Sequence, residues 1–552
     1  MMTAQLYRDG WIRLIAAFCL ALLLAGPALA QPQRTGTLKV RVTDESGRSL
    51  PARVHLRDSA GRWLLPPGHS TRQRAVYRGT QPIAGDWFYV DGSFSIDVPS
   101  GEAQIDIAHG PAYTTAHDSI FIEAGQIVEK TYVLRRLVDL PALGWDSGDE
   151  HLHQTPDAAV TLAEDLNVVA VPVCDNPRLQ YRADQKVTLL PDATHLLVTQ
   201  MPAVEWDCFL WNLPKPLALR LGDDDWPDGD GTTAAEQKDP KLRGGGYTLR
   251  TPFLVRSPFV IEQAHAAGAT TVAYMHDPPR LWYYPLYVAN GWIDVYGVLE
   301  NGYCGIANRT EAEFWRGYDA NFGIWYRFLN CGYRLPASAG TDNIGMGVGV
   351  WKGYNRVYVK VEGAFTLGKW VAALKQGRSF VTNRPLLFVT VDRHEPGSQL
   401  AVRSEQDARL KVDIRVVSAT PVSRIDVLHN GRVLRQIDLD AAATDIRRSE
   451  DVTVSKSGWL AVRCLGRGQN ANLGPAFALA HTSPFYVIVD GQPIRSPDDA
   501  RWLHEQFSAF VSQSLPRVEN GQVRALLEAK CKEALAKYAA QAAIAETERG
   551  RP

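Results

Sequence analysis

The densest group of reactive side chains in the sequence is the hexapeptide Gly-Asp-Glu-His-Leu-His at residues 148–153. It follows a short apolar stretch and precedes a segment with helical pattern. Alternate residues of an extended segment point the same way, so His151 and His153 should aim at one point beyond the end of a strand. Two imidazoles, with the carboxylates of Asp149 and Glu150 beside them, suit zinc, manganese or iron. The hexapeptide therefore predicts a divalent-metal site.

Three further candidate ligands, Glu205, His276 and Asp342, each follow a short apolar run that is typical of a buried strand. In α/β barrels the catalytic groups gather at the carboxyl ends of the strands. Together with the two histidines of the hexapeptide, these side chains would hold a divalent cation near neutral net charge. Each one also has a structural alternative: His276 as a core histidine, Asp342 as a turn cap, and Glu205 as part of a surface loop.

The elements that must position these residues lie between residues 140 and 385. Short continuous apolar runs, which are typical of buried parallel strands, alternate there with helical patterns. This alternation predicts an α/β domain. The expected strands include 167–173, 270–275 and 293–298, and the expected helices include 156–165, 258–267 and 311–330.

The flanking segments have a different pattern of apolar and polar residues. Residues 36–137 and 386–490 alternate apolar and polar side chains with period two, which predicts a β-sandwich on either side of the α/β domain. The first of them resembles carboxypeptidase-regulatory-like accessory domains. The dipeptide Asn430-Gly431 predicts a tight hairpin turn. Residues 496–549 are expected to be helical, with Ser-Pro-Asp-Asp at their start as the cap.

Residues 1–30 have the layout of a secretory signal peptide. Two arginines precede an apolar run at residues 14–25, and Ala-Leu-Ala at 28–30 provides a cleavage site before Gln31. The run is shorter than the roughly 20 residues that span a bilayer. We therefore expect a periplasmic or secreted protein without a transmembrane span. Export permits a disulfide between Cys304 and Cys331, and the sequence leaves this pairing open.

The overall charge narrows the class of partner. The formal net charge is −1, so the chain has no strong field that would attract nucleic acid. We expect a small-molecule or glycan substrate and no nucleic-acid partner, and the sequence leaves the oligomeric state open.

The segment 140–385 resembles the CehA/McbA-type metallohydrolases of the polymerase-and-histidinol-phosphatase (PHP) superfamily. The family motif Gly-Asp-Leu-His-x-His is matched at residues 148–153, with Glu in place of Leu. The late Gly-Ser/Thr-Asp motif is matched within Ser-Ala-Gly-Thr-Asp at 338–342. Residues 377–385 (Gly-Arg-Ser-Phe-Val-Thr-Asn-Arg-Pro) resemble the closing block of the family. The resemblance implies a distorted (β/α)7 barrel flanked by N- and C-terminal β-sandwich domains.

Carried over residue by residue, the resemblance implies that His151, His153 and Asp342 are ligands of a first metal. Glu205 would be the bridging acid and His276 a ligand of a second metal. The chain departs from the family where Thr-Asp-His-Asn has become Val-Cys-Asp-Asn at 173–176 and where Asp-x-His has become Asp-Asn-Ile at 342–344. The expected Gly-His pair is also absent. These residues amount to about one complete metal site and half of another.

These observations predict an exported hydrolase that depends on a divalent metal (zinc, manganese or iron) and cleaves phosphate ester, carboxylic ester or carbamate bonds with a metal-activated water. His276 or Asp175 would serve as acid or base, and Arg356 or Arg378 would bind an anionic group or form a structural ion pair. The alternative is a catalytically degenerate barrel that binds glycans or other ligands.

Overall fold

The computed structural model describes most of the chain, apart from its ends and several internal segments. The expected signal peptide (1–30) lies outside the described residues, as do Asp175, Glu205, His276 and Cys304. The described residues are 34–72, 85–173, 183–204, 208–217, 251–274, 283–300, 310–342, 351–403, 409–440, 443–518 and 520–549.

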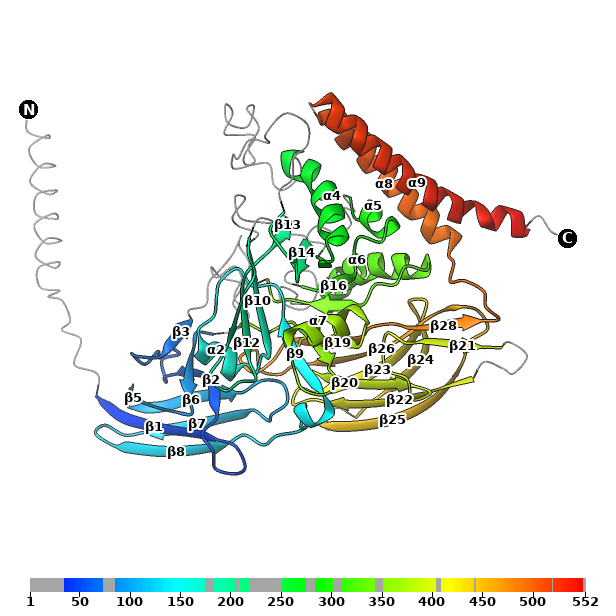
Figure 1. The fold of residues 1–552 in the computed structure, drawn as a ribbon. Helices are drawn as coiled ribbons and strands as arrows, with labels where there is room; N and C mark the ends of the chain where they lie inside the picture. Colours follow the sequence, from blue (N-terminus) through cyan, green and yellow to red (C-terminus); the bar gives the residue numbers. More distant parts are fainter. Residues whose placement is uncertain are drawn as a thin grey trace, which may run out of the picture.

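The N-terminal region consists of two sheets that share one hydrophobic core (Figure 1). In the first strand, Leu38, Val40 and Val42 alternate with more exposed residues, and their burial anchors the three-stranded sheet to the other one. This arrangement agrees with the sandwich expected for residues 36–137. The three-stranded sheet has the order β5 (Ser93–Pro99), β1 (Thr35–Thr43), β8 (Ile127–Val133), and the five-stranded sheet has the order β3 (Ser70–Arg72), β4 (Trp87–Asp91), β2 (Pro51–Arg57), β6 (Gly101–Ala108), β7 (Ala116–Ile122).

The middle region contains both parallel strands and helices, which confirms the mixed α/β class. One set of strands begins a twelve-stranded sheet in the order β11 (Lys186–Leu189), β12 (Leu196–Met201), β10 (Val168–Pro172), β9 (Trp145–Asp149), β18 (Arg356–Lys360), β19 (Ser379–Thr382). A second sheet has the order β13 (Ala203–Val204), β14 (Cys208–Trp211), β15 (Thr270–Tyr274), β16 (Val295–Leu299), β17 (Ala337–Ala339).

Helices accompany these strands (Figure 1), and side chains of the two sheets contribute to one core. The helices are η1 (Pro141–Leu143), α2 (Ala158–Ala163), α4 (Thr251–Ala266), α5 (Tyr284–Ala289), α6 (Glu311–Asn330) and α7 (Leu367–Lys375). In α6, the Thr310 side chain accepts from Glu313 N and the Glu313 side chain accepts from Thr310 N, which fixes the helix start where the sequence predicts it. The closed seven-stranded barrel stays a prediction, because the described strands of this region lie in two separate sheets.

The C-terminal region extends the same twelve-stranded sheet. Strand β19 pairs with β27 (Phe477–Thr482), and the sheet continues through β26 (Gly458–Arg467), β23 (Val422–His429) and β24 (Arg432–Asp438). Strands β21 (Gln399–Val402) and β28 (Phe485–Val489) pair with each other, and β28 also pairs with β26. The sheet therefore crosses the boundary at 385/386 that the change in hydrophobic pattern predicts.

A three-stranded sheet packs over this part through a shared core, as the sandwich prediction for 386–490 requires. Its order is β20 (Leu386–Val391), β22 (Arg409–Val417), β25 (Asp445–Thr453). The hairpin between β23 and β24 turns at Asn430 and Gly431, with φ values of 51° and 79°. Two successive positive φ angles are the mark of the type I′ turn that Asn-Gly favours, so the predicted turn is confirmed.

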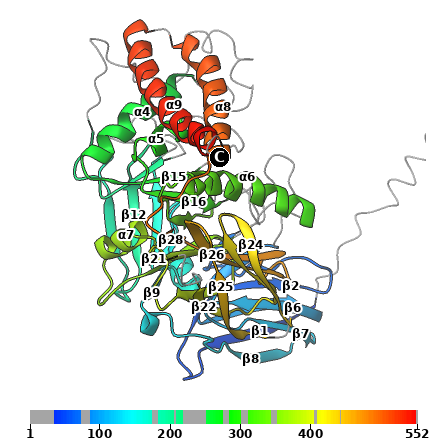
Figure 2. The same ribbon diagram turned by 90° about the vertical axis from the view of Figure 1, so that its right-hand side faces the viewer.

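The tail forms two helices, α8 (Pro497–Ser514) and α9 (Gly521–Arg549), joined through the short helix η5 (Leu515–Arg517). The Ser496 side chain accepts from Asp499 N, which confirms the predicted cap. Figure 2 shows the pair beside α4 and α5, and the Tyr538 hydroxyl donates to Pro285 O at 2.9 Å. Within the described residues, no helix has the length and apolar character that a bilayer crossing needs. Cys331 carries a free, buried thiol.

Candidate metal centre

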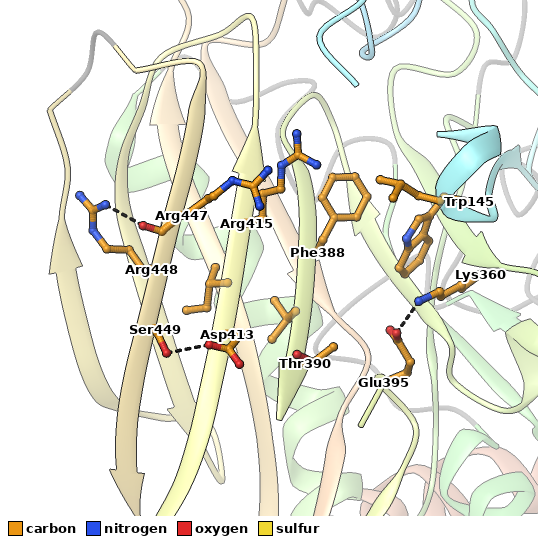
Figure 3. A pocket seen from close by; sticks show the side chains of 13 residues that line it. Trp145, Lys360, Phe388, Thr390, Glu395, Asp413, Arg415, Arg447, Arg448 and Ser449 are labelled. Carbon is orange, nitrogen blue, oxygen red and sulfur yellow. Dashed lines mark hydrogen bonds and ion pairs between the residues drawn. The ribbon is translucent and has the colours of Figure 1, made fainter. Parts of the chain in front are cut away.

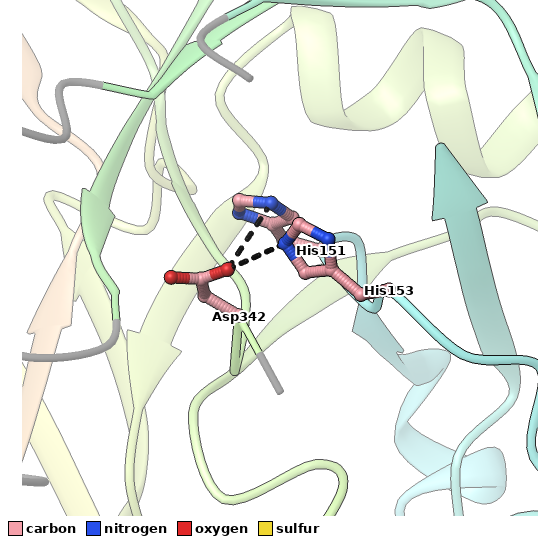
Figure 4. Close-up of side chains that lie close together, drawn as sticks. All are labelled: His151, His153 and Asp342. Atoms are coloured by element: carbon pink, nitrogen blue, oxygen red, sulfur yellow. Dashed lines mark hydrogen bonds and ion pairs between the residues drawn. The ribbon is translucent and has the colours of Figure 1, made fainter. Parts of the chain in front are cut away.

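The structure brings three of the predicted ligands together. His151, His153 and Asp342 each offer one ligand atom, and these atoms all lie within 4.8 Å of one another. The Asp342 Oδ1 atom is 2.8 Å from His153 Nε2 and 3.4 Å from His151 Nε2, and Figure 4 shows both rings directed at this carboxylate. The grouping follows the i, i+2 argument, because both imidazoles come from the extended segment that leaves β9.

Backbone contacts fix this segment. Leu152 N donates to Ala170 O at 3.1 Å, which continues the pairing of β9 with β10 beyond the end of β9. The Leu152 side chain is buried in a small apolar cluster with Leu166, so the histidines on either side of it turn the other way. Asp342 N donates to His151 O at 2.7 Å, and this bond ties the two halves of the candidate centre.

A glycine makes the close approach of these two segments possible. A Cβ atom on Gly340 would overlap the Cβ atom of His151 and would lie only 2.8 Å from His151 N. No residue with a side chain fits this position without moving the histidine segment. The Gly of the Ser-Ala-Gly-Thr-Asp motif is therefore explained by packing against the histidine motif.

The two acidic residues of the hexapeptide have different surroundings. Asp149 is buried and accepts from Thr341 N (2.9 Å), Thr341 Oγ1 (2.6 Å) and Gly353 N (2.7 Å), so it holds two loops beside the candidate centre. Glu150 is also buried, 3.4 Å from the hydroxyl of Tyr274, and burial raises its pKa to about 8. Neither belongs to the group of His151, His153 and Asp342.

One residue of this centre was not predicted from the sequence. Glu300 directly follows β16, it is fully buried, and its carboxylate contacts His151 Nδ1. A carboxylate on one ring nitrogen fixes the tautomer and directs the other nitrogen outward, as in many metal-ligating histidines. Its position after an apolar strand is the same signal that singled out Asp342.

Of the remaining predicted site residues, the structure describes only Arg356 and Arg378. Glu205, His276 and Asp175 lie outside the described residues, so their roles stay predictions. Arg356 is buried, with its Nε donating to Gly353 O at 2.7 Å and its Nη1 donating to Glu164 O at 2.8 Å. These contacts are structural, and its proposed binding of an anionic substrate group stays a prediction.

The donor set fits the expected cofactor. Two imidazoles and one carboxylate form the kind of three-residue set found in catalytic zinc sites, and two histidines with a carboxylate also serve non-haem iron. The His153 and Asp342 side chains are 9% and 16% exposed, whereas His151 is completely buried. The group therefore meets solvent on the side of Asp342 and His153.

A second polar feature lies on the outer face of the C-terminal sheet β20–β22–β25. It is a groove of about 540 Å³ (Figure 3). Two cross-strand rows form its floor: Phe388, Arg415 and Arg447 in one, and Thr390, Asp413 and Ser449 in the other. Four cationic side chains and two carboxylates line the groove, so its charge favours an anionic ligand. They are Lys360, Arg415, Arg447 and Arg448, with Glu395 and Asp413.

Comparisons with known proteins give no family. No protein-family model matches the chain, and no curated protein matches it. Among solved structures, "Structure of the Streptococcal ancillary pilin" is similar at 12% identity and a TM-score of 0.14, over 36% of this chain and 61% of the pilin chain. The chain thus matches less than two thirds of the pilin, and a TM-score this low bears on neither fold nor function.

Proposed function

We propose that the protein is a metal-dependent hydrolase of ester-type bonds, of the CehA/McbA type within the PHP superfamily. The observation that carries this proposal is the convergence of His151, His153 and Asp342 at the ends of β9 and β17. Three ligand atoms within 4.8 Å of one another, contributed from sequence positions about 190 residues apart, are the arrangement that a bound cation requires.

The side chains of this centre have distinct parts in the proposed function. His151, His153 and Asp342 would hold zinc, manganese or iron, and Glu300 would orient His151. A divalent cation in such a site lowers the pKa of water and polarises the bond under attack. Substrate would approach from the side of Asp342 and His153, since His151 has no exposed surface.

The finer parts of the proposal come from the sequence. They are export by a cleaved signal peptide, action on phosphate ester, carboxylic ester or carbamate bonds, Glu205 as an additional ligand, and His276 or Asp175 as the proton-transfer group.

Metal content and hydrolysis, measured on the same preparation of the mature protein, test the proposal. We expect about one tightly held divalent metal per chain and slow hydrolysis in a screen of generic phosphate and carboxylic esters, both abolished by a chelator. A metal-loaded preparation that hydrolyses no ester above the buffer rate would refute the catalytic proposal.

The groove on the C-terminal sheet favours the second candidate, a protein that binds acidic glycans. Arg415 is held by two hydrogen bonds to Asp445, whereas Arg448 forms no ion pair with any acidic residue of the described chain. Guanidinium groups recognise carboxylates by paired hydrogen bonds. Affinity electrophoresis against an acidic and a neutral polysaccharide tests this candidate. Retardation by the acidic polymer alone, lost on combining Arg447→Ala with Arg448→Ala, would support it, and equal mobility in both gels would exclude it.

A further inference from the structure

Three arginines from different regions of the chain are buried together beside the middle region. Arg53 lies on β2 of the N-terminal region, Arg356 begins β18, and Arg384 stands between β19 and β20. Their exposed fractions are 0%, 2% and 3%. We call Arg53, Arg356 and Arg384 the arginine cluster. It lies where the N-terminal, middle and C-terminal regions meet.

Shared contacts place the three guanidinium groups close to one another. Glu164 Oε1 is 2.8 Å from Arg53 Nε, and Glu164 Oε2 is 3.9 Å from Arg356 Nη2. Burial, together with repulsion from the Arg53 and Arg356 charges, lowers the pKa of Arg384 to about 10. Arg53 and Arg384 also approach the same loop, since Arg53 Nη1 donates to Asn472 O at 2.6 Å and the Arg384 side chain lies beside Gly474.

The charges of the arginine cluster do not balance. In the described part of the chain, Glu164 is the one carboxylate that forms ion pairs with the cluster, and none pairs with Arg384. Three guanidinium charges against the one carboxylate that pairs with them leave an excess of positive charge in the cluster. Two other acids pair elsewhere: Asp165 pairs with His195 and also feels the charge of Arg356, and Asp106 is bound by His117 and by the Asn470 and Asn472 amides.

The histidine beside the cluster, His55, does not change this charge balance. Burial and the Arg53 charge lower the pKa of His55 well below its ordinary value, so this imidazole is neutral. Its Nε2 accepts from Arg53 Nη1 at 2.7 Å, and its Nδ1 donates to Asp86 O at 3.1 Å. The face of Arg53 is covered by Trp351, whose ring centroid is 3.5 Å away.

Several donors of the arginine cluster have no acceptor. Arg53 Nη2, Arg384 Nε and Arg384 Nη2 are shielded from solvent, and no atom of the described chain accepts a hydrogen bond from them. A buried donor without an acceptor costs about 1–3 kcal/mol, and more when it is charged. Buried charges in proteins are paired or bind ions. Three such donors on two neighbouring cations therefore indicate a ligand that the described part of the chain does not provide.

We propose that the arginine cluster binds one small inorganic oxyanion, phosphate or sulfate, which joins the three regions of the molecule. Guanidinium groups bind such oxyanions through pairs of parallel N–H donors, and the Nε and Nη2 atoms of Arg384 form such a pair. The negative charge of such an anion offsets the positive excess of the cluster. This site is separate from the candidate metal centre, and the proposal does not depend on hydrolysis.

Thermal unfolding of the mature protein, freed of oxyanions by desalting into a chloride buffer, tests the proposal. Millimolar phosphate or sulfate, at ionic strength matched with sodium chloride, should raise Tm by several degrees and saturably, because a ligand of the folded state stabilises it. Arg384→Met should abolish the saturable rise. Arg501→Met should retain it, because Arg501 is exposed and pairs with Asp498.

The same measurements can overturn the proposal. If the arginine cluster binds no oxyanion, wild-type Tm will not depend on phosphate or sulfate, and Arg384→Met will raise Tm because an apolar side chain replaces an unpaired buried charge. Equal shifts in wild type and Arg384→Met would mean a general salt effect and would also reject the site.

A milder variant and a direct assay cover the case in which Arg384→Met does not fold. Arg384→Lys keeps the charge but loses the paired donors, so its apparent affinity for phosphate should fall about tenfold. Ion chromatography of acid-denatured wild-type protein, prepared without desalting against chloride, should release about one phosphate or sulfate per chain. Unchanged affinity in Arg384→Lys, or release of neither anion, would contradict the proposal.

Discussion

The candidate metal centre and the arginine cluster are both buried groups of polar side chains, but their charges have opposite signs. At the metal centre two imidazoles, which bind metals in their neutral form, lie beside the carboxylates of Asp342 and Glu300. In the arginine cluster three guanidinium groups meet the carboxylate of Glu164. Since buried charges need partners, the first group calls for a cation and the second for an anion. The sign of a buried charge excess thus indicates the class of ligand.

The two groups are connected through one residue, Gly353. Gly353 N donates to Asp149, two residues before His151, and Gly353 O accepts from Arg356. A side chain at this position would meet both the Arg356 guanidinium and Leu166. Variants that change one group and leave the other unchanged can therefore separate the effect of the metal centre from that of the arginine cluster.

The largest effect is expected from removing both imidazoles of the metal centre. His151→Ala combined with His153→Ala takes away two of the three grouped ligands, so bound metal should fall from about one per chain to none. Elemental analysis of the purified variant measures this loss. The phosphate-dependent rise in Tm should remain, and unchanged metal content in the double variant would reject the ligand assignment.

A smaller effect is expected from Glu300→Gln. The amide keeps the shape of the side chain but removes the charge that supports His151, and loss of such a partner weakens metal binding about 10–100-fold. Competition with a chelator of known affinity measures the change. Glu311→Gln is a matched control, because Glu311 is exposed and pairs with Arg467. Equal metal affinity in wild type and Glu300→Gln would show that Glu300 has no part in the centre.

Gly340→Ala tests the close approach of the two halves of the centre. The added methyl group collides with His151, and such overpacking costs about 1–3 kcal/mol of stability. Gly323→Ala is the control, because a Cβ atom there meets nothing within 4 Å and alanine favours the helix α6. Urea unfolding should show the first variant destabilised and the second equal to wild type or slightly more stable. The reverse order would disprove the packing argument.

The smallest effect concerns pH and the arginine cluster. The pKa of His55 is lowered below 6.5 in the folded protein, so the unfolded chain takes up a proton first as the pH falls. The stability from neutral His55 is fully present above about pH 6.5 and is lost below it, by at most about 1.4 kcal/mol per pH unit. His55→Gln should reduce the difference in unfolding free energy between pH 7.5 and pH 5. The exposed His394→Gln should not, and equal reductions in both variants would count against the assignment.

The parts of the site that depend on local backbone were predictable from the sequence. The i, i+2 spacing of His151 and His153 needs only an extended segment after a strand, and Asp342 was found by its position at the end of another one. Glu300 directly follows the buried strand β16, so its position carried the same signal as that of Asp342, although nothing local identifies its partner His151, which lies 149 residues away. The excess charge of the arginine cluster was invisible in the sequence, since Arg53 lies in the N-terminal region and Arg356 and Arg384 lie in the middle region.

In the fold, too, local features were predictable from the sequence and long-range pairings were not. Helix α6 and the Asn430-Gly431 turn follow from capping and turn chemistry, which act within a few residues. Helix α4 shows the limit of such signals: it begins at Thr251, so the expectation that Pro258 opens it was wrong, and the proline lies inside the helix. The pairing of β19 with β27 joins residues about one hundred positions apart, and no local pattern specifies that register.

The continuous twelve-stranded sheet has a consequence for how the chain can be divided. A polypeptide that stops at residue 385 would lose the neighbour of β19, and the backbone of Phe380, Val381 and Thr382 would form an exposed strand edge. Such edges recruit strands from other molecules and promote aggregation. A fragment that ends at residue 385 is therefore expected to self-associate through this edge.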